Sequence, residues 1–155
     1  MKKTMKGRTL ETSALHLLHR AGQCAEVLFA KETGRSELTP RQYAILATVA
    51  ANPDVSQTGL VEQTGVDRST LADIVRRLVE RKLLQRKRTK EDARMYAVRI
   101  TAKGRAALSS MRPAASRVDT HILSVLKANE RARFIAALGE IVRAMSRSAM
   151  EDDAG

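Results

Sequence analysis

The sequence predicts a mainly α (α+β) fold, in which one β-hairpin interrupts a series of helices and long helices lie toward both ends. Apolar residues recur at helical spacing in several segments of the 155-residue chain. Two strand-like runs flank a short charged connection: residues 84–88, where Leu84, Arg86 and Arg88 alternate with Gln85 and Lys87, and residues 95–100, which are rich in strand formers. The length suits one domain, residues 1–155, with its own core.

Two helices are predicted before the centre of the chain. The first spans about residues 10–31, and its apolar positions alternate spacings of four and three residues: Leu10, Ala14, Leu17, Ala21, Cys24 and Leu28. Such a seam suits packing against another helix, which could belong to a partner chain. The second begins at Thr39, which stands at capping-box spacing from Gln42, with Pro40 at the first helical position. It ends near Pro53, which cannot continue it.

Residues 57–80 are predicted to form two helices joined by a tight turn at Gly65, where a left-handed backbone is often needed. Asp67 is a good N-cap for the second of them, and Val66 and Leu71 have the spacing of a hydrophobic staple. One face of this helix is apolar, with Leu71, Ile74, Val75 and Leu78. The opposite face is polar, with Arg68, Ser69, Thr70, Asp73, Arg76 and Arg77.

The hairpin that follows is strongly basic. From Arg76 to Arg105 there are twelve Lys/Arg and three Asp/Glu, so this segment carries 12 − 3 = +9 of the chain's formal charge of +11. Positive charge concentrated on one segment indicates a polyanionic ligand. The helix pair and the basic hairpin together predict a winged helix-turn-helix lobe at about residues 39–100, a module that places one helix in the major groove of DNA.

Two more helices are predicted after the hairpin, from about Ala102 to Leu126 and from Glu130 to about Ser146. Pro113 should kink or interrupt the first of them. The second gathers its apolar residues on one side: Phe134, Ile135, Leu138, Ile141, Val142 and Met145. The terminal helices have more apolar surface than a small monomer can use. We therefore predict a homodimer held by about residues 10–31 and 102–147, which would read two DNA half-sites.

Composition excludes several classes of protein. Aromatic residues make up 3% of the chain and Trp is absent, which weakens any single-strand reader that stacks bases on aromatic rings. No apolar run approaches the ~20 residues of a membrane span. A single cysteine and the lack of a signal peptide favour the reducing cytoplasm. The chain shows no carboxylate pair, nucleophile–base set or phosphate loop, so we expect no enzymatic activity and no cofactor.

Four segments carry a family resemblance: residues 38–46 (LTPRQYAIL), 60–71 (LVEQTGVDRSTL), 92–94 (DAR) and 100–104 (ITAKG). Their order and spacing resemble the MarR family of bacterial transcription regulators, and the similarity covers about residues 10–145. The resemblance implies a homodimer with a winged-helix lobe on each side. It also implies binding to a palindromic operator, usually by a repressor that a small ligand or oxidation releases.

The same resemblance assigns roles in DNA binding. Ser69 and Thr70 match positions that face the major groove, and Arg68 and Arg76 flank them. Further members of the predicted DNA-binding set are Arg77, Lys90, the wing-tip arginine Arg94, which reaches the minor groove, and Asp92, the acid that steadies the wing.

Asp73 departs from the polar or basic residue expected in the middle of the recognition helix. It could accept a hydrogen bond from a cytosine amino group. We favour a second interpretation, in which it pairs with Arg76 or Arg77, three and four residues further on.

Three residues are candidates for an effector site. Arg20 and Tyr43 could line a cleft between the lobe and the dimer base, where relatives take aromatic carboxylates or acyl-CoA thioesters. They could equally be a surface arginine and a half-buried core tyrosine. Cys24 could be a redox switch, but its place on the apolar seam also fits a small hydrophobe. Three scattered histidines, His16, His19 and His121, do not predict a metal site.

The predicted function is a dimeric repressor that binds double-stranded DNA and is released by a small ligand, an aromatic acid or its CoA thioester. Two alternatives remain at this stage. One is a redox-responsive repressor that uses Cys24, and the other is a winged-helix DNA-binding protein without an effector.

Overall fold

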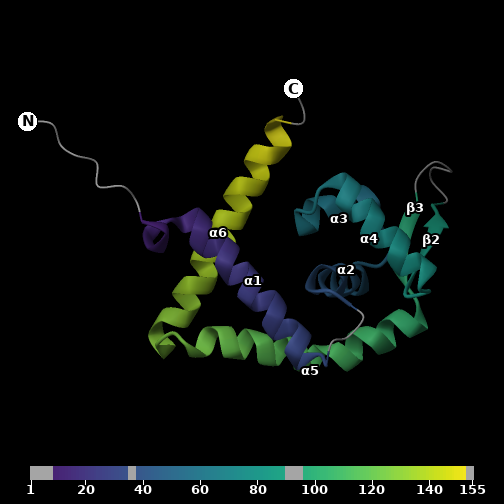
Figure 1. Cartoon of the computed structure of the whole chain (residues 1–155). Coiled ribbons are helices and arrows are strands. Elements are labelled where there is room, and N and C mark those ends of the chain that lie inside the picture. The colour runs from purple at the N-terminus through teal and green to yellow at the C-terminus, as the bar shows by residue number, and fades with distance from the viewer. Residues whose placement is uncertain (1–8, 35–37, 90–95, 153–155) are drawn as a thin grey trace, which may run out of the picture.

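The computed structural model describes residues 9–34, 38–89 and 96–152, which form a mainly helical fold with one small sheet (Figure 1). In chain order the elements are η1 (Leu10–Thr12), α1 (Ala14–Glu32), α2 (Pro40–Ala51), β1 (Val55–Ser56), α3 (Gln57–Thr64), α4 (Arg68–Glu80), β2 (Leu84–Arg88), β3 (Tyr96–Ile100), α5 (Ala102–Ser124) and α6 (Ala128–Asp152). The predicted mainly α (α+β) class, with its winged helix-turn-helix, is confirmed.

The first long helix begins later than predicted, at Ala14 rather than Leu10. The side chain of Ser13 accepts a hydrogen bond from the backbone N–H of His16, whereas Leu10–Thr12 forms a short 3-10 turn. A serine that satisfies an amide of the first turn fixes the start of a helix. On the predicted seam, Leu28 packs against the core, while Leu17 and Cys24 are exposed.

The winged-helix lobe has an apolar core to which α2, α3, α4 and the sheet all contribute. Its most deeply buried side chains are Ile45, Leu46, Val49, Leu60, Leu71, Val75, Leu78, Leu84 and Val98. The capping box at the start of α2 is confirmed, since Thr39 and Gln42 each accept a hydrogen bond from the other's backbone amide. The turn between α3 and α4 is confirmed as well, with Gly65 at φ +66°.

The sheet has three antiparallel strands in the order β1-β3-β2. The hairpin of β2 and β3 is as predicted, with Leu84 opposite Ile100 and Arg88 opposite Tyr96. β1 was not predicted. It consists of two residues that pair with Val98 and Ala97 of β3, and a two-residue strand is too short to leave a periodic pattern in the sequence.

The two C-terminal helices differ in detail from the prediction. Pro113 lies inside α5 without interrupting it, and the ribbon of α5 bends near its middle in Figure 1. A bend is the expected result where proline lacks the amide that would bond the preceding turn. α6 begins at Ala128 rather than Glu130, and Glu130 accepts a hydrogen bond from the amide of Lys127 (3.2 Å).

The end of α4 is fastened to the start of α5. The hydroxyl of Thr101 donates to the carbonyl of Lys82 (2.7 Å), and the Lys103 ammonium donates to the carbonyl of Arg81 (3.1 Å). A Cβ on Gly104 would lie 2.1 Å from the Leu83 carbonyl oxygen, so this approach requires glycine. We call this junction of residues 81–83 with residues 101–104 the α4–α5 clamp.

Large apolar side chains remain exposed on η1, α1 and α6, the elements that lie away from the sheet in Figure 1. They are Leu10, Leu15, Leu17, Leu18 and Val27 in the N-terminal part, and Phe134, Ile135, Ile141, Val142 and Met145 on α6. Across the described residues, no helix combines the length and the apolar character that crossing a membrane would take.

Candidate nucleic-acid interface and effector pockets

Helix α4 has a buried apolar face and an exposed polar face, as the sequence predicts. Leu71, Ile74, Val75 and Leu78 are buried against the lobe core. Arg68, Ser69, Arg76 and Arg77 are exposed, and Thr70 and Asp73 are partly so. Because the apolar side is fixed in the core, the polar side is presented outward as one continuous surface.

The start of α4 is held by the side chain of Asp67. Its carboxylate accepts hydrogen bonds from the Thr70 amide (2.9 Å) and the Ser69 hydroxyl (2.8 Å). Hydrogen bonding by Thr70, from side chain and backbone, and by Ser69 lowers the pKa of Asp67 to about 2. The two residues predicted to face the groove therefore also build the first turn of the helix.

The arginines of α4 are paired with acids on the same helix. Asp73 Oδ1 lies 2.6 Å from Arg76 Nη2, and Asp73 Oδ2 lies 2.8 Å from Arg77 Nε. Glu80 Oε1 lies 2.7 Å from Arg76 Nη1. The interpretation of Asp73 as an arginine partner is confirmed, and it engages both arginines. Hydrogen bonds from Arg76, and then from Arg77, lower the pKa of Asp73.

The wing adds positive charge beside α4. Arg86, Lys87 and Arg88 on β2 are exposed, and the Arg88 guanidinium lies 5.7 Å from the centroid of the Tyr96 ring. The predicted DNA-binding set did not include these β2 cations, although three consecutive basic residues in the sequence indicate a site for phosphates. Lys90, Asp92 and Arg94, the predicted wing-tip residues, lie outside the described residues.

A tie between β3 and the turn before β1 steadies the base of the wing. Arg99 of β3 forms an ion pair with Asp54, which has a positive φ of 60°. This bond from Arg99 lowers the pKa of Asp54. The pair joins segments 45 residues apart, so it could not be read from the sequence.

Tyr43 lines a pocket of about 320 Å³ between α1, α2 and α5. Its wall is largely apolar: Gly22, Ala25, Phe29, Pro40, Tyr43, Ala115, Val118 and Ile122, with the carboxylates of Glu26 and Asp119 also present. The rings of Phe29 and Tyr43 lie 6.0 Å apart in a tilted arrangement. Arg20 and Cys24, the other effector candidates, do not line this pocket. Arg20 donates to the side chain of Gln23 (3.1 Å), and Cys24 is exposed.

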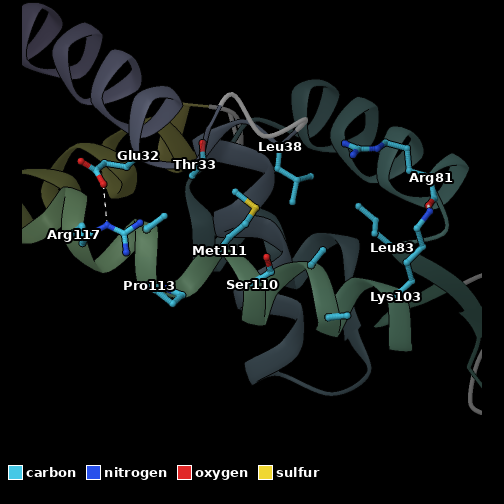
Figure 2. Close-up of a pocket in the computed structure, with 13 residues that line it drawn as sticks. Glu32, Thr33, Leu38, Arg81, Leu83, Lys103, Ser110, Met111, Pro113 and Arg117 are labelled. Carbon is cyan, nitrogen blue, oxygen red and sulfur yellow. Dashed lines mark hydrogen bonds and ion pairs between the residues drawn. The ribbon is translucent and has the colours of Figure 1, made fainter.

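A second pocket, of about 750 Å³, lies between the end of α1, the α4–α5 clamp and one face of α5 (Figure 2). At one end, Arg117 Nε donates to Glu32 (2.8 Å) and lowers the pKa of that carboxyl. At the other end stand Arg81 and Lys103. The prediction missed this pocket. Its floor is apolar and draws on three separate segments of the chain: Leu38, Leu83, and Ala107, Met111 and Ala114 of α5.

No group of three or more His, Cys, Asp or Glu side chains that could hold a metal ion occurs within residues 9–34, 38–89 and 96–152. The arrangement of α3, α4 and the basic hairpin defines a winged helix-turn-helix protein of the kind that docks on DNA.

Comparison with known proteins agrees with this assignment to the winged helix-turn-helix class. Residues 36–95 match the family model described as MarR family. The transcriptional regulator HosA of Escherichia coli O157:H7 is 31% identical over 142 residues, covering 88% of this chain and 97% of HosA. The HTH-type transcriptional repressor NicR of Pseudomonas putida is 31% identical over 127 residues, covering 82% of this chain and 80% of NicR. The chain therefore belongs to the MarR family, and it is a transcription regulator and not an enzyme.

Two solved structures are close in fold. PcaV of Streptomyces coelicolor, in complex with its natural ligand, gives a TM-score of 0.85 at 31% identity and covers 91% of this chain and 99% of PcaV. BpsR of Bordetella bronchiseptica, whose DNA binding is regulated by 6-hydroxynicotinic acid, gives a TM-score of 0.81 at 28% identity and covers 86% of this chain and 96% of BpsR.

Proposed function

We propose that the protein is a homodimeric repressor that binds a palindromic operator in double-stranded DNA and leaves it when a small aromatic acid binds. The observation that carries the proposal is the division of α4 into a buried face and an exposed polar face. Its apolar face is locked in the lobe core, while its outer face offers Arg68, Ser69 and Thr70 at the helix start. Side chains at that end of a recognition helix are the ones that reach base edges in the major groove.

Charge supports DNA as the partner. The exposed cations of β2 lie next to α4 in the chain and continue its basic surface. Their contacts would go mainly to phosphates, which position the protein, while the start of α4 supplies sequence selection. The proposed interface comprises Arg68, Ser69, Thr70, Asp73, Arg76, Arg77, Lys90, Asp92 and Arg94, with the β2 residues Arg86, Lys87 and Arg88 added.

The exposed apolar surface supports a dimer. Leu15 is 81% exposed on α1 and Val142 is 61% exposed on α6, each among further apolar neighbours. Burying such a face against a second copy recovers hydrophobic free energy that the isolated protomer forgoes. The resulting symmetry places two lobes side by side for two half-sites.

The Tyr43 pocket suits the ring of a small aromatic acid. Its volume of about 320 Å³ and its apolar wall fit one substituted ring. The cation for the carboxylate is not in the described lining, so we assign it to Arg20. This residue lies on the exposed side of α1 with Leu17 and Cys24, the side we assign to the dimer contact. Arg20 would then complete the pocket of the other protomer.

A larger anion, such as a CoA thioester, is the second candidate effector, and one observation favours it. The pocket of Figure 2 has more than twice the volume, with Arg117 at one end, Arg81 and Lys103 at the other, and an apolar floor between them. Guanidinium and ammonium groups at its ends would hold phosphates, and the floor would hold the acyl part.

A gel-shift titration tests the function. The purified protein is titrated against the intergenic DNA upstream of its own gene and against scrambled DNA, at several salt concentrations. We expect a tight shift of the upstream DNA with dimer stoichiometry. Equal binding to both DNAs, with a steep salt dependence, would leave only electrostatic attraction and would refute the operator proposal.

Release by effectors is tested on the same complex. Phenolic acids, their CoA thioesters and peroxide are added to the shifted DNA. Ala115→Trp fills the Tyr43 pocket and Ala107→Trp fills the larger one. A response lost only in the first variant supports an aromatic acid, and one lost only in the second supports a thioester. Release by peroxide that Cys24→Ser abolishes would instead establish the redox alternative.

A further inference from the structure

The two arginines in the second half of α4 are exposed, but their guanidinium groups are engaged by acids of the same helix. Both side chains fold back along the helix onto Asp73, at 2.6 Å for Arg76 and 2.8 Å for Arg77. Asp73 thus uses one carboxylate oxygen for each arginine, and Arg76 is held from its other side by Glu80 at 2.7 Å. The spacings of three and four residues place all of these groups on one strip of the helix surface.

Arg68 contrasts with them. It stands at the start of the same helix, it is exposed, and among the described residues it has no ion-pair partner. The helix therefore presents one free arginine next to Ser69 and Thr70, and two arginines whose charges are offset by Asp73 and Glu80. This division separates the end of α4 proposed to read bases from the part that would lie along the sugar–phosphate backbone.

Additional cationic side chains on the protein change its affinity for non-specific DNA and its affinity for an operator by different amounts. Binding to arbitrary DNA comes almost entirely from neutralised phosphates, and the protein can shift its register until each free cation finds one. On an operator, base contacts fix the register, so a freed arginine gains a phosphate only if one happens to stand within reach. Keeping cations away from the phosphates therefore weakens binding to non-specific DNA more than it weakens binding to the operator.

We propose that Asp73 is a specificity-determining residue, which holds Arg76 and Arg77 against α4 and so withholds two cations from the phosphates of arbitrary DNA. This inference rests on the proposed function, because it requires α4 to be the helix that docks on DNA. It explains an acid in the middle of a helix whose task otherwise favours positive charge. Discrimination here comes from weakening the wrong complex, not from a further contact with the right one.

The test compares Asp73→Asn with wild type in fluorescence-anisotropy titrations against upstream and scrambled DNA from 50 to 200 mM salt. Asp73→Asn leaves Arg77 without its acid partner, while Arg76 keeps Glu80. For scrambled DNA, the slope of log K against log salt should therefore steepen by about 1 per protomer, and by up to about 2 if Arg76 also leaves Glu80 for a phosphate. Affinity for scrambled DNA should rise, and the ratio of operator to scrambled affinity should fall. Asp73→Glu, which keeps the carboxylate, should restore both the slope and the ratio toward wild type.

Glu62→Gln is the matched control. It removes the same charge from the same lobe, but Glu62 is exposed and, within the described part of the chain, has no ion-pair partner to release. Equal slopes for Asp73→Asn and Glu62→Gln would overturn the inference. So would weaker operator binding by Asp73→Asn at unchanged scrambled binding, since that is the signature of a lost base contact. Failure of the wild-type protein to bind either DNA would overturn the proposed function itself.

Discussion

Single residues at the start of α4 combine a folding role with a proposed DNA-binding role. Asp67 takes the Ser69 hydroxyl and the Thr70 amide as hydrogen-bond donors, so the helix start is ordered before any DNA is present. An ordered reading surface loses less conformational entropy on binding. A change at Asp67 is therefore expected to affect both the stability of the lobe and its affinity for DNA.

Asp67→Ala should destabilise the protein at neutral pH, and the difference from wild type should shrink as the pH falls from about 4 to about 2. The pKa of Asp67 is lowered to about 2 from 3.8, so its charge stabilises the folded state above the higher value and ceases to do so on protonation. Urea midpoints measured from pH 7 to pH 2 follow the difference. A gap of constant size over that range would contradict the prediction. Asp67→Asn, which caps without a charge, should show a smaller gap at neutral pH.

Gly104→Ala should lower the free energy of unfolding by about 2–3 kcal/mol, because its Cβ would meet the Leu83 carbonyl oxygen at 2.1 Å. Gly22→Ala is the matched control in a helix, since nothing lies within 4 Å of the added Cβ. It should be neutral or stabilise by up to about 1 kcal/mol. Both are measured by urea unfolding at one protein concentration. Similar effects at the two positions would show that the clamp can yield.

At the scale of elements, α4 has two faces with separate tasks. Its buried face joins the core of the lobe, and its outer face carries the residues proposed to contact DNA. Substitutions on the buried face should therefore change stability, whereas substitutions on the outer face should change DNA binding.

Leu78→Ala should lower the free energy of unfolding by about 2–5 kcal/mol, because Leu78 is completely buried. Arg68→Ala, on the outer face, should change stability by less than about 0.5 kcal/mol but weaken operator binding by about 1–3 kcal/mol. Urea unfolding and anisotropy titration measure the two quantities on each variant. Loss of stability in Arg68→Ala would mean that this arginine has a structural role.

Local patterns predicted most of these elements, and contacts between distant segments account for what was missed. The Thr39 capping box, the Gly65 turn and the pairing of Asp73 lie within four residues of chain, so spacing alone identified them. β1 exists only through its pairing with β3, about forty residues away. Apart from Tyr43, which was predicted to line a cleft and does line a pocket, the pocket linings were also beyond reach, because helical periodicity gives an apolar face but not the helix that covers it.

At the scale of the whole molecule, the main feature outside the winged-helix lobe is the exposed apolar surface of α1 and α6. Ile141 and Val142 on α6 are 45% and 61% exposed, and α1 adds its own exposed leucines. Each protomer would bury these side chains against the other, and the separation of the two recognition helices would then depend on this contact.

Ile141→Glu should shift the protein from dimer to monomer in sedimentation equilibrium and weaken operator binding, because a charge at that contact is costly to desolvate. Ile141→Leu keeps the apolar area and should remain dimeric. A Glu variant that stays dimeric would remove this part of α6 from the interface. A monomer with undiminished operator affinity would show that the two lobes bind independently.

Because of the α4–α5 clamp, α4 must also follow any change in the direction of the N-terminal half of α5. About eleven residues separate Pro113 from the clamped end, a length of about 17 Å at the rise of an α-helix. A further bend of about 10° at Pro113 would move that end, and α4 with it, by about 3 Å, which is close to the 3.4 Å step along one strand of B-DNA. Both pockets have walls on α5, and the larger one includes Pro113 itself. Under the proposed function, an effector would need no large rearrangement to release the operator, because a change of angle too small to disturb the core would shift both recognition helices by about one base relative to their half-sites.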